Sequence, residues 1–300
     1  MGRVALITGS ASGIGLAVAK HLAIEKEGWK VVLLDSNGEA GAAAAASIPD
    51  AVFVEVDVTS WSSLSRAFDE TFAMFGGIDF VYANAGIFER GNFYEDLTAG
   101  TRSDKRMPPP PPPNLLVLEV NLKAIIMTSY LAQHYFRLSP HKGKDAALVM
   151  TSSVCGLYPS QYTPIYAATK AGVVNFMRSI APPFYTSDGI RVYAICPGSV
   201  RTDFLNDQEW AMFPAELFTP MSTVATTVAM LLEGGDMTDA WGRKVVAGQD
   251  YGLAVEINRT NIYFRDPPEY CDDAMKATME GSKMESQAER LSTNSKRGGS

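Results

Sequence analysis

Short apolar runs alternate along most of this chain with longer stretches in which apolar residues recur every three or four positions. Short runs bounded by glycine or polar residues are typical of strands buried on both faces, and the longer pattern predicts helices. Predicted strands cover 4–8, 31–34, 51–56, 79–83, 147–151, 190–195 and 244–246, and predicted helices cover 16–23, 38–47, 60–75, 115–138, 166–181 and 222–233. Strands that alternate with helices predict an α/β fold with a parallel sheet covered on both faces.

Two stretches interrupt this rhythm. Residues 98–114 begin as a polar segment and include six consecutive prolines, Pro108–Pro113, which favour a stiff, extended surface insertion. A proline run can also be a ligand for an SH3-type domain, although a spacer is the simpler interpretation. From residue 266 the apolar pattern disappears, and we expect 266–300 to be a mostly disordered tail. Residues 1–265 are therefore predicted to form one domain.

The composition, with 46% hydrophobic and 20% charged residues, is that of a globular protein. The formal net charge of −7 argues against nucleic acid as a partner and against a basic membrane-binding patch. No apolar stretch reaches the roughly 20 residues of a membrane span, and we expect no signal peptide before strand 4–8. Cys155, Cys196 and Cys271 show no disulfide or metal spacing, and the histidines are scattered. We therefore expect a cytoplasmic protein without a catalytic metal.

The segment between the first strand and the first helix is rich in glycine. Glycines let the backbone approach a pyrophosphate, which the free N–H groups of a helix N-terminus can bind. By itself such a loop is often only a turn, and its G-x-x-x-G-x-G spacing differs from the common G-x-G-x-x-G fingerprint. Its place between strand and helix nevertheless favours a dinucleotide site that includes Gly9, Ser12, Gly13, Ile14 and Gly15.

Asp35 ends the second strand, about 20 residues after the glycines, where an acidic side chain is expected to bind the adenosine ribose hydroxyls. Its charge would repel a 2′-phosphate, and no Arg or Lys stands at Ser12, Ser36 or Asn37 to bind one. The sequence therefore predicts NAD rather than NADP. The third strand ends at Asp57-Val58, where the adenine could rest. Asn84-Ala85-Gly86, after the fourth strand, could be only a turn or could admit a cofactor ring.

The candidate chemistry lies in Tyr166-x-x-x-Lys170, with Ser153 thirteen residues before the tyrosine. If Tyr166 begins a helix, Lys170 lies one turn further along the same face. An ammonium near a phenol favours the phenolate and lowers the phenol pKa from its ordinary value of about 10. Such a tyrosine could exchange a proton with an alcohol or a carbonyl. The pattern alone also describes a buried Tyr with an exposed helix Lys, and the other motifs decide between the two.

Taken together, these motifs resemble those of the short-chain dehydrogenase/reductase family. The resemblance covers roughly residues 3–250 and rests on Thr8-Gly9-x-x-x-Gly13-x-Gly15, Asp57, Asn84-Ala85-Gly86, Asn121, Ser153, Tyr166-x-x-x-Lys170 and Pro197-Gly198 with Thr202. Asp35 and the strand end Ile195–Gly198 are similar to the NAD-dependent 15-hydroxyprostaglandin dehydrogenase-like branch. The proline-rich insertion and Tyr263–Asp266 resemble filamentous-fungal members of that branch.

The resemblance implies a single Rossmann-type domain, doubly wound around a seven-stranded parallel sheet, in an NAD-dependent oxidoreductase that interconverts a secondary alcohol and a ketone. Tyr166 would be the acid and base, Lys170 would lower its pKa and hold the nicotinamide ribose, and Ser153 would bind the substrate oxygen. Asn121 would distort its helix and hold a water that relays the proton. The implied cofactor contacts also include Asn84, Ala85, Gly86, Pro197, Gly198, Val200 and Thr202, the last of which would bind the carboxamide.

Pro182-Pro183 departs from the family pattern, because the helix that follows Tyr166 normally continues past this point. A proline pair inside a helix costs several kcal/mol or ends it, so we predict that the helix stops near Ile180 or Ala181. In this family the helix forms half of a common dimer interface. The departure therefore bears on the homodimer or homotetramer that the resemblance implies.

Residues 203–220 are apolar and punctuated by prolines, which suits a lid over an apolar small molecule such as a terpenoid, polyketide, steroid or fatty-acid derivative of secondary metabolism. The same segment could instead pack against another subunit. Two other functions stay open: an epimerase or dehydratase of the same fold with tightly held NAD, and a non-catalytic NAD-sensing scaffold protein. The complete set of Asn121, Ser153, Tyr166 and Lys170 favours an enzyme.

Overall fold

A computed structural model describes residues 2–96, 109–284 and 286 of the chain. The chain divides into two compact units, Met1–Arg265 and Asp266–Ser300. The larger unit contains an eight-stranded sheet with the order β10-β9-β6-β5-β4-β1-β2-β3. Its strands are β1 (Arg3–Thr8), β2 (Trp29–Asp35), β3 (Val52–Glu55), β4 (Phe80–Ala83), β5 (Ala147–Thr151), β6 (Arg191–Pro197), β9 (Ala254–Asn258) and β10 (Asn261–Arg265).

The sheet has eight strands, and the prediction of seven parallel strands is wrong in this respect. Seven strands run parallel, but β10 pairs antiparallel with β9 after a tight turn in which Arg259 adopts a left-handed conformation (φ 55°). At the end of β10, Arg265 Nη1 donates to Glu256 Oε2 (2.8 Å) and to Tyr158 Oη (3.0 Å). The extra strand is thereby anchored to the loop that follows Ser153.

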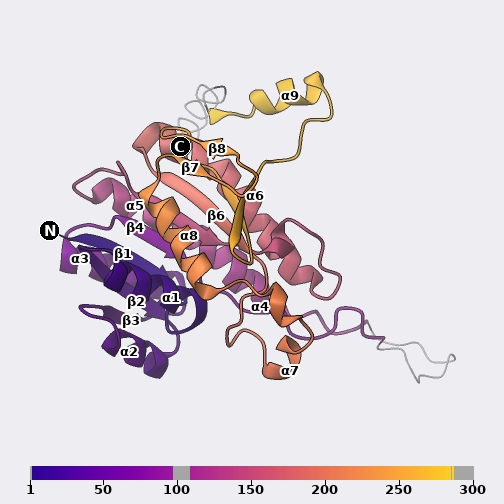
Figure 1. Cartoon of the computed structure of the whole chain (residues 1–300), viewed down its shortest axis with the longest axis horizontal. Helices are drawn as coiled ribbons and strands as arrows, with labels where there is room; N and C mark the ends of the chain where they lie inside the picture. Colours follow the sequence, from indigo (N-terminus) through magenta and orange to yellow (C-terminus); the bar gives the residue numbers. More distant parts are fainter. Residues whose placement is uncertain (1, 97–108, 285, 287–300) are drawn as a thin grey trace, which may run out of the picture. The chain divides into compact units, whose positions relative to one another are not determined.

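Side chains that alternate along each strand enter two separate cores, as expected for a sheet covered on both faces. Val4 and Leu6 of β1 pack with helices α3 (Trp61–Phe75), α5 (Ala124–Leu138) and α6 (Pro164–Asp188). Ala5 and Ile7 pack on the other side with α1 (Gly13–Lys20), α2 (Gly38–Ala46) and α8 (Met221–Glu233). Figure 1 shows these helices against the sheet. The parallel arrangement places the carboxyl ends of β1, β4, β5 and β6 at one edge.

Helix α6 runs through the proline pair to Asp188, so the prediction that it stops near Ile180 or Ala181 is wrong. The cost of the missing N–H groups is offset by tertiary contacts beyond them. Ala181 and Phe184 are buried against the sheet, and Asp188 is paired with Arg137 of α5 at 2.7 Å. Gly189, with φ 73°, then closes the helix in the left-handed conformation that glycine tolerates.

Two further elements differ from the predicted ones, and the predicted tail contains one helix. The predicted strand 244–246 is β8 (Lys244–Val245), which pairs only with β7 (Met237–Thr238) outside the main sheet. The predicted helix 115–138 is divided into α4 (Leu116–Leu118), the π-helical η2 (Glu119–Lys123) and α5. The tail predicted to be mostly disordered contains α9 (Asp273–Glu280), because Asp272 accepts a hydrogen bond from the Met275 N–H and caps the helix. The remaining short elements are η1 (His21–Glu25), η3 (Val154–Gly156), α7 (Asp207–Trp210) and η4 (Ala215–Leu217).

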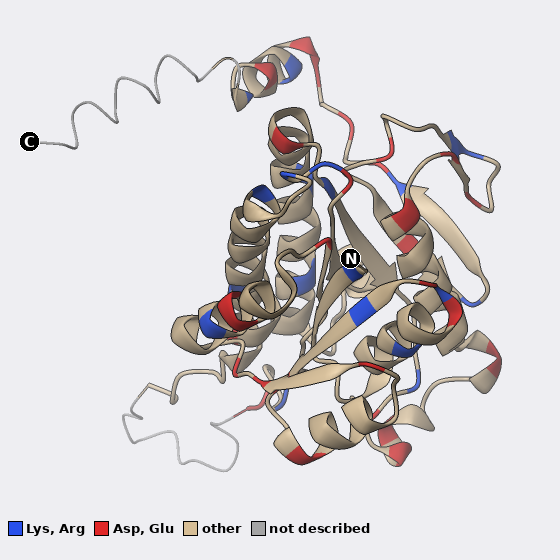
Figure 2. Cartoon of the chain, turned by 90° about the vertical axis from the view of Figure 1, so that its left-hand side faces the viewer, with Lys and Arg blue, Asp and Glu red and all other residues tan. Residues whose placement is uncertain are grey.

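One described segment, Ala215–Glu233, is long and apolar enough to cross a membrane by length and composition. It consists of η4, residues 218–220 and α8, and Val224, Val228 and Leu231 of α8 are fully buried in one of the two cores. Figure 2 shows Lys and Arg interspersed with Asp and Glu over the visible helices and loops rather than gathered into a basic face. Most of the predicted insertion 98–114 lies outside the described residues, and Pro109–Pro113 are exposed.

Candidate active site

A cavity of about 810 Å³ opens at the carboxyl edge of the sheet. Nearly all of the predicted site residues line it, including Ser153, Tyr166, Lys170 and Asp35. Two predicted residues, Gly15 and Asn121, do not line it. Each instead contacts residues that do: Gly15 packs against Gly9, and Asn121 bonds to Ile87. The segments that form the cavity come from the ends of six strands, β1 to β6, which is where ligands bind in open α/β sheets.

The glycine loop forms the wall between β1 and α1. Gly9 (φ 64°) and Gly13 (φ 54°) have left-handed backbones, and a Cβ at Gly15 would lie 2.2 Å from the Gly9 carbonyl oxygen. Only glycine therefore fits at Gly15 without moving the turn. The turn leads into the N-terminus of α1, whose free N–H groups favour an anion. Ser12 and Ile14 line the cavity beside the glycines.

Asn84 ties this loop to the middle of the sheet. Its Nδ2 donates to the carbonyls of Thr8 (3.2 Å) and Gly9 (3.1 Å), and its Oδ1 accepts from Thr151 Oγ1 (3.0 Å). Thr8 Oγ1 accepts from the backbone N–H groups of Asn84 and Ala85. Asn84-Ala85-Gly86 is therefore more than a turn, because it joins three neighbouring strand ends.

Asp35 lies at the end of β2 and lines the cavity. Its carboxylate accepts from the Ala11 N–H (Oδ2, 3.0 Å) and from the Asn37 N–H (Oδ1, 3.0 Å), which fixes it between the glycine loop and the start of α2. Asp57 and Val58 follow β3 and line the same end of the cavity. Asp57 Oδ1 accepts from the N–H and the hydroxyl of Thr59.

Tyr166 and Lys170 project from the first turns of α6 toward Ser153 at the end of β5. Both side chains are buried, and Lys170 Nζ lies 5.5 Å from the centre of the Tyr166 ring. Lys170 Nζ donates to the Thr151 carbonyl at 2.9 Å. Ser153 Oγ accepts from the Cys155 N–H at 3.1 Å, which orients the hydroxyl at the edge of the cavity. The structure thus brings the three residues together.

Burial dominates the electrostatics of this group. Burial raises the pKa of Tyr166 above its ordinary value, and a hydrogen bond with Ser153 acts in the opposite direction without reversing the shift. The net direction is therefore opposite to the lowered phenol pKa that the sequence predicts, because burial is the largest cause. Burial also lowers the pKa of Lys170 to about 8, so that its ammonium is still the main form at neutral pH.

Asn121 lies in the π-helical segment η2 and is fully buried. Its Oδ1 accepts from the Ile87 N–H (2.8 Å) and its Nδ2 donates to the Ile87 carbonyl (2.9 Å). A Cβ at Gly86 would lie 3.4 Å from Asn121 Oδ1 and 3.6 Å from Lys170 Nζ, so the chain passes closely between the two side chains. The side-chain amide of Asn121 holds the loop that follows β4.

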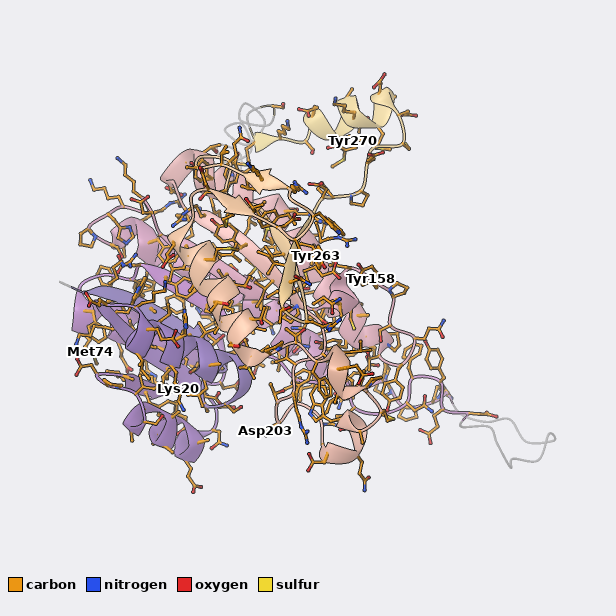
Figure 3. The ribbon with its side chains drawn as sticks, in the orientation of Figure 1. Lys20, Met74, Tyr158, Asp203, Tyr263 and Tyr270 are labelled. Carbon is orange, nitrogen blue, oxygen red and sulfur yellow. The ribbon has the colours of Figure 1, made fainter. Side chains whose placement is uncertain are left out.

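The loop after β6 closes the remaining side of the cavity. Pro197, Gly198, Val200 and Thr202 line it, and the Thr202 methyl group lies 3.3 Å from where a Cβ at Gly13 would stand. The Thr202 carbonyl accepts from Trp210 Nε1 at 2.8 Å. This bond holds the first part of the segment 203–220 beside the cavity. From that segment the cavity is lined by Asp203, Phe204, Leu205, Trp210 and Phe213, and Figure 3 marks Asp203.

Sequence reasoning missed the three residues Phe88, Glu89 and Arg90. The centroid of the Phe88 ring lies 5.5 Å from that of Tyr166 and 5.6 Å from that of Phe204. Glu89 Oε2 accepts from the Tyr166 N–H at 2.7 Å. Arg90 Nη1 is paired with Glu209 Oε1 at 3.0 Å. No local pattern identifies these residues, because they follow a predicted strand at the point where the regular alternation ends. Among the described residues, no cluster of three or more His, Cys, Asp or Glu side chains could hold a metal.

Comparisons with known proteins agree with this geometry. A family profile described as "short chain dehydrogenase" matches residues 3–211. Short-chain dehydrogenase/reductase prx7 of Penicillium rubens is 46% identical over 279 residues, which are 91% of this chain and 98% of that protein. Human 15-hydroxyprostaglandin dehydrogenase [NAD(+)] is 32% identical over 216 residues, 69% of this chain and 72% of that protein.

Solved structures show the same fold. A short chain dehydrogenase from Burkholderia cenocepacia, in complex with NADP, superposes with a TM-score of 0.67 at 24% identity and covers 87% of this chain and 97% of its own. A 3-ketoacyl-(acyl-carrier-protein) reductase from Brucella melitensis, complexed with NADH, gives a TM-score of 0.66 at 23% identity and covers 86% of this chain and 98% of its own.

Proposed function

The chain belongs to the short-chain dehydrogenase/reductase family of oxidoreductases, and we propose that it interconverts a secondary alcohol and a ketone on an apolar small molecule with NAD as its cofactor. The observation that carries this proposal is the position of Tyr166. Its buried phenol shares one cavity with Ser153, Lys170, the glycine loop and Asp35. A proton-exchanging group and a dinucleotide cradle in the same cavity suit alcohol–ketone chemistry.

Four features of the cavity support a nicotinamide dinucleotide. The glycine loop offers a close backbone and a helix N-terminus for the pyrophosphate, and Asp35 stands where the adenosine ribose would lie. The Asp35 carboxylate would repel a 2′-phosphate, and Ser12, Ser36 and Asn37 around it carry no positive charge. Thr202 and the backbone after Pro197 face the same cavity as Tyr166. These residues support NAD over NADP.

In the oxidation direction, Ser153 and Tyr166 would hold the substrate hydroxyl between them. The Tyr166 phenolate takes the hydroxyl proton, and the carbon–oxygen bond becomes a carbonyl as the carbon loses its hydrogen with the bonding electrons. Bound NAD supplies the acceptor for that hydride. The Lys170 ammonium, at 5.5 Å from the ring centre in a buried setting, favours the phenolate. In the reduction direction the Tyr166 phenol returns the proton to the carbonyl oxygen.

The substrate side of the cavity supports an apolar molecule. Phe88, Phe204, Trp210 and Phe213 form much of its wall, whereas Arg90, the cation beside these rings, is already paired with Glu209. A carboxylate on the substrate would have to compete with Glu209 for Arg90 and would meet Asp203 at the wall. A neutral, largely hydrocarbon alcohol meets neither cost.

A screen of apolar secondary alcohols against both cofactors tests the proposal. We expect the reduced-nicotinamide absorbance band to appear with NAD and at least one such alcohol, and the matching ketone to consume NADH in reverse. We expect kcat/KM with NADP to be lower by about tenfold or more. If neither cofactor is reduced across the panel while NAD binds, the proposed reaction is wrong. A preference for NADP would refute the role of Asp35 alone.

A further inference from the structure

The first turn of α6 has no cap from its own sequence neighbourhood. The first four N–H groups of a helix need acceptors, and an N-cap side chain usually supplies one. Here the N-cap residue Thr163 makes no such bond, since its hydroxyl pairs with Ser160 Oγ at 2.9 Å. Pro164 follows and has no N–H. The Tyr166 N–H, in the third helical position, therefore needs an acceptor from elsewhere in the chain.

Glu89 supplies that acceptor from the loop after β4. Its Oε2 lies 2.7 Å from the Tyr166 nitrogen, and both residues are buried, with 7% and 8% of their surfaces exposed. The next residue, Arg90, pairs with Glu209 at 3.0 Å. A carboxylate at a helix N-terminus is favoured by the helix dipole, and a charge-assisted hydrogen bond is stronger than a neutral one.

The segment just before Glu89 is itself fixed by other contacts. The Asn121 amide bonds both the N–H and the carbonyl of Ile87, two residues before Glu89. The ring of Phe88, between them in sequence, lies 5.5 Å from the Tyr166 ring. One short segment thus contacts Tyr166 twice, once at its ring and once at its backbone.

We propose that Glu89 is a positioning residue for the oxidoreductase reaction: its carboxylate holds the first turn of α6 so that the Tyr166 phenol stays beside Ser153. Glu89 is absent from the residues that line the cavity, whereas Phe88 and Arg90 on either side of it line the wall. It therefore acts through Tyr166 rather than on the substrate. Catalysis is sensitive to small displacements of a reacting group. The inference rests on the proposed function, in which Tyr166 exchanges the proton.

Three variants separate the hydrogen bond from the charge. Glu89→Gln keeps an acceptor oxygen at the same reach without the charge, Glu89→Ala removes the acceptor, and Glu89→Asp keeps the charge on a shorter side chain. Asp272→Ala is the matched control, because the Asp272 carboxylate also accepts from the N–H of a third helical residue, Met275, at 2.7 Å. That bond lies in α9, in the unit formed by 266–300.

The readouts are kcat and KM for an alcohol that the wild type oxidises, the Kd for NAD by fluorescence titration, and hydrogen exchange of the Tyr166 amide. We expect Glu89→Ala and Glu89→Asp to lower kcat by about tenfold or more while the Kd for NAD stays within about twofold. Glu89→Gln should keep kcat within about threefold of the wild type, and Asp272→Ala should not change it. The Tyr166 amide should exchange at least about tenfold faster in Glu89→Ala than in Glu89→Gln.

Several outcomes would overturn the proposal. One is a kcat for Glu89→Ala within twofold of the wild type, and another is unchanged exchange of the Tyr166 amide. Full activity in Glu89→Asp with loss in Glu89→Gln would show that charge rather than the hydrogen bond matters. If Glu89→Ala does not fold, the comparison of Glu89→Asp with Glu89→Gln still decides. If the wild type oxidises no alcohol, the proposed function fails, and the exchange measurement still tests the bond to Tyr166.

Discussion

Replacing Lys170 by methionine should remove activity and at the same time stabilise the fold. The ammonium of Lys170 is buried, with 2% of the residue exposed, and its one hydrogen bond among the described contacts is to the Thr151 carbonyl at 2.9 Å. A lysine kept in such a place costs folding free energy, because the charged form is taken from water into the interior. Methionine has a similar length and fills the same space without the charge.

The magnitude follows from the pKa of this lysine. Burial lowers the pKa of Lys170 from 10.5 to about 8. At about 1.4 kcal/mol for each tenfold change in proton affinity, holding the charged lysine costs the folded state about 3 kcal/mol at neutral pH. The hydrogen bond to Thr151 returns about 1 kcal/mol. We therefore expect Lys170→Met to raise the free energy of unfolding at pH 7 by about 2 kcal/mol.

The sign of the pH dependence distinguishes this explanation from simple repacking. Because the folded pKa lies below the unfolded one, the cost of Lys170 is complete below pH 8 and disappears as the pH rises toward 10.5. The stabilisation should therefore be largest at pH 7 and clearly smaller near about pH 9.5. Urea unfolding at both pH values measures it, with Lys20→Met, at an exposed position of α1 (Figure 3), as the control.

A Lys170→Met protein that is less stable than the wild type at pH 7 would refute this reasoning, and so would a stability difference that is the same at both pH values. The control should change the free energy of unfolding by less than about 0.5 kcal/mol at either pH. Turnover should fall by at least about a hundredfold, since the phenolate of Tyr166 loses its nearest cation. Activity close to that of the wild type would remove Lys170 from the mechanism.

Three other predictions concern the same cavity. Because burial raises the pKa of Tyr166, the phenolate is scarce at neutral pH, so kcat/KM for oxidation should rise from about pH 6 to about pH 8, the range in which Lys170 keeps its ammonium, and that for ketone reduction should not; flat profiles in both directions would contradict this. Asp35→Ser should lower the NAD-to-NADP ratio of kcat/KM by about tenfold or more; an unchanged ratio would exclude Asp35 as its determinant. Phe204→Ala should raise KM for an apolar alcohol by about tenfold and leave KM for NAD unchanged, since it removes a ring 6.1 Å from Tyr166; equal changes in both would contradict a substrate-wall role.

Local patterns were enough to predict most of the sheet and most of the cavity. Thr8 and Asp35 end buried strands, Asn84 and Ser153 closely follow two others, and a parallel sheet brings such ends to one edge. The spacing of Tyr166 and Lys170 then needs only a helix to place both side chains together. Each of these features depends on residues that lie close together in the sequence, so each can be predicted from the sequence alone.

What the sequence did not predict depends on contacts between distant segments. Glu89 accepts a hydrogen bond from the Tyr166 N–H although 77 positions separate the two residues. No local sequence pattern identifies either residue as a partner. The sequence Pro182-Pro183 predicts a helix end. The helix nevertheless continues to Asp188, where burial of Phe184 and the cap at Gly189 stabilise its last turns. Strand β10 pairs antiparallel with β9 after a tight turn, and its last residue, Arg265, bonds back to Glu256 of β9. The direction of the Tyr166 pKa shift is set by burial, which only the folded chain defines.

The central claim is that Tyr166 exchanges the proton beside a bound nicotinamide. The most direct test compares Tyr166→Phe with the wild type in two measurements, the Kd for NAD by fluorescence titration and single-turnover reduction of NAD by an alcohol substrate. We predict a Kd within about twofold of the wild type and a turnover rate lower by about a thousandfold or more. A rate within tenfold of the wild type, with NAD bound normally, would contradict the account.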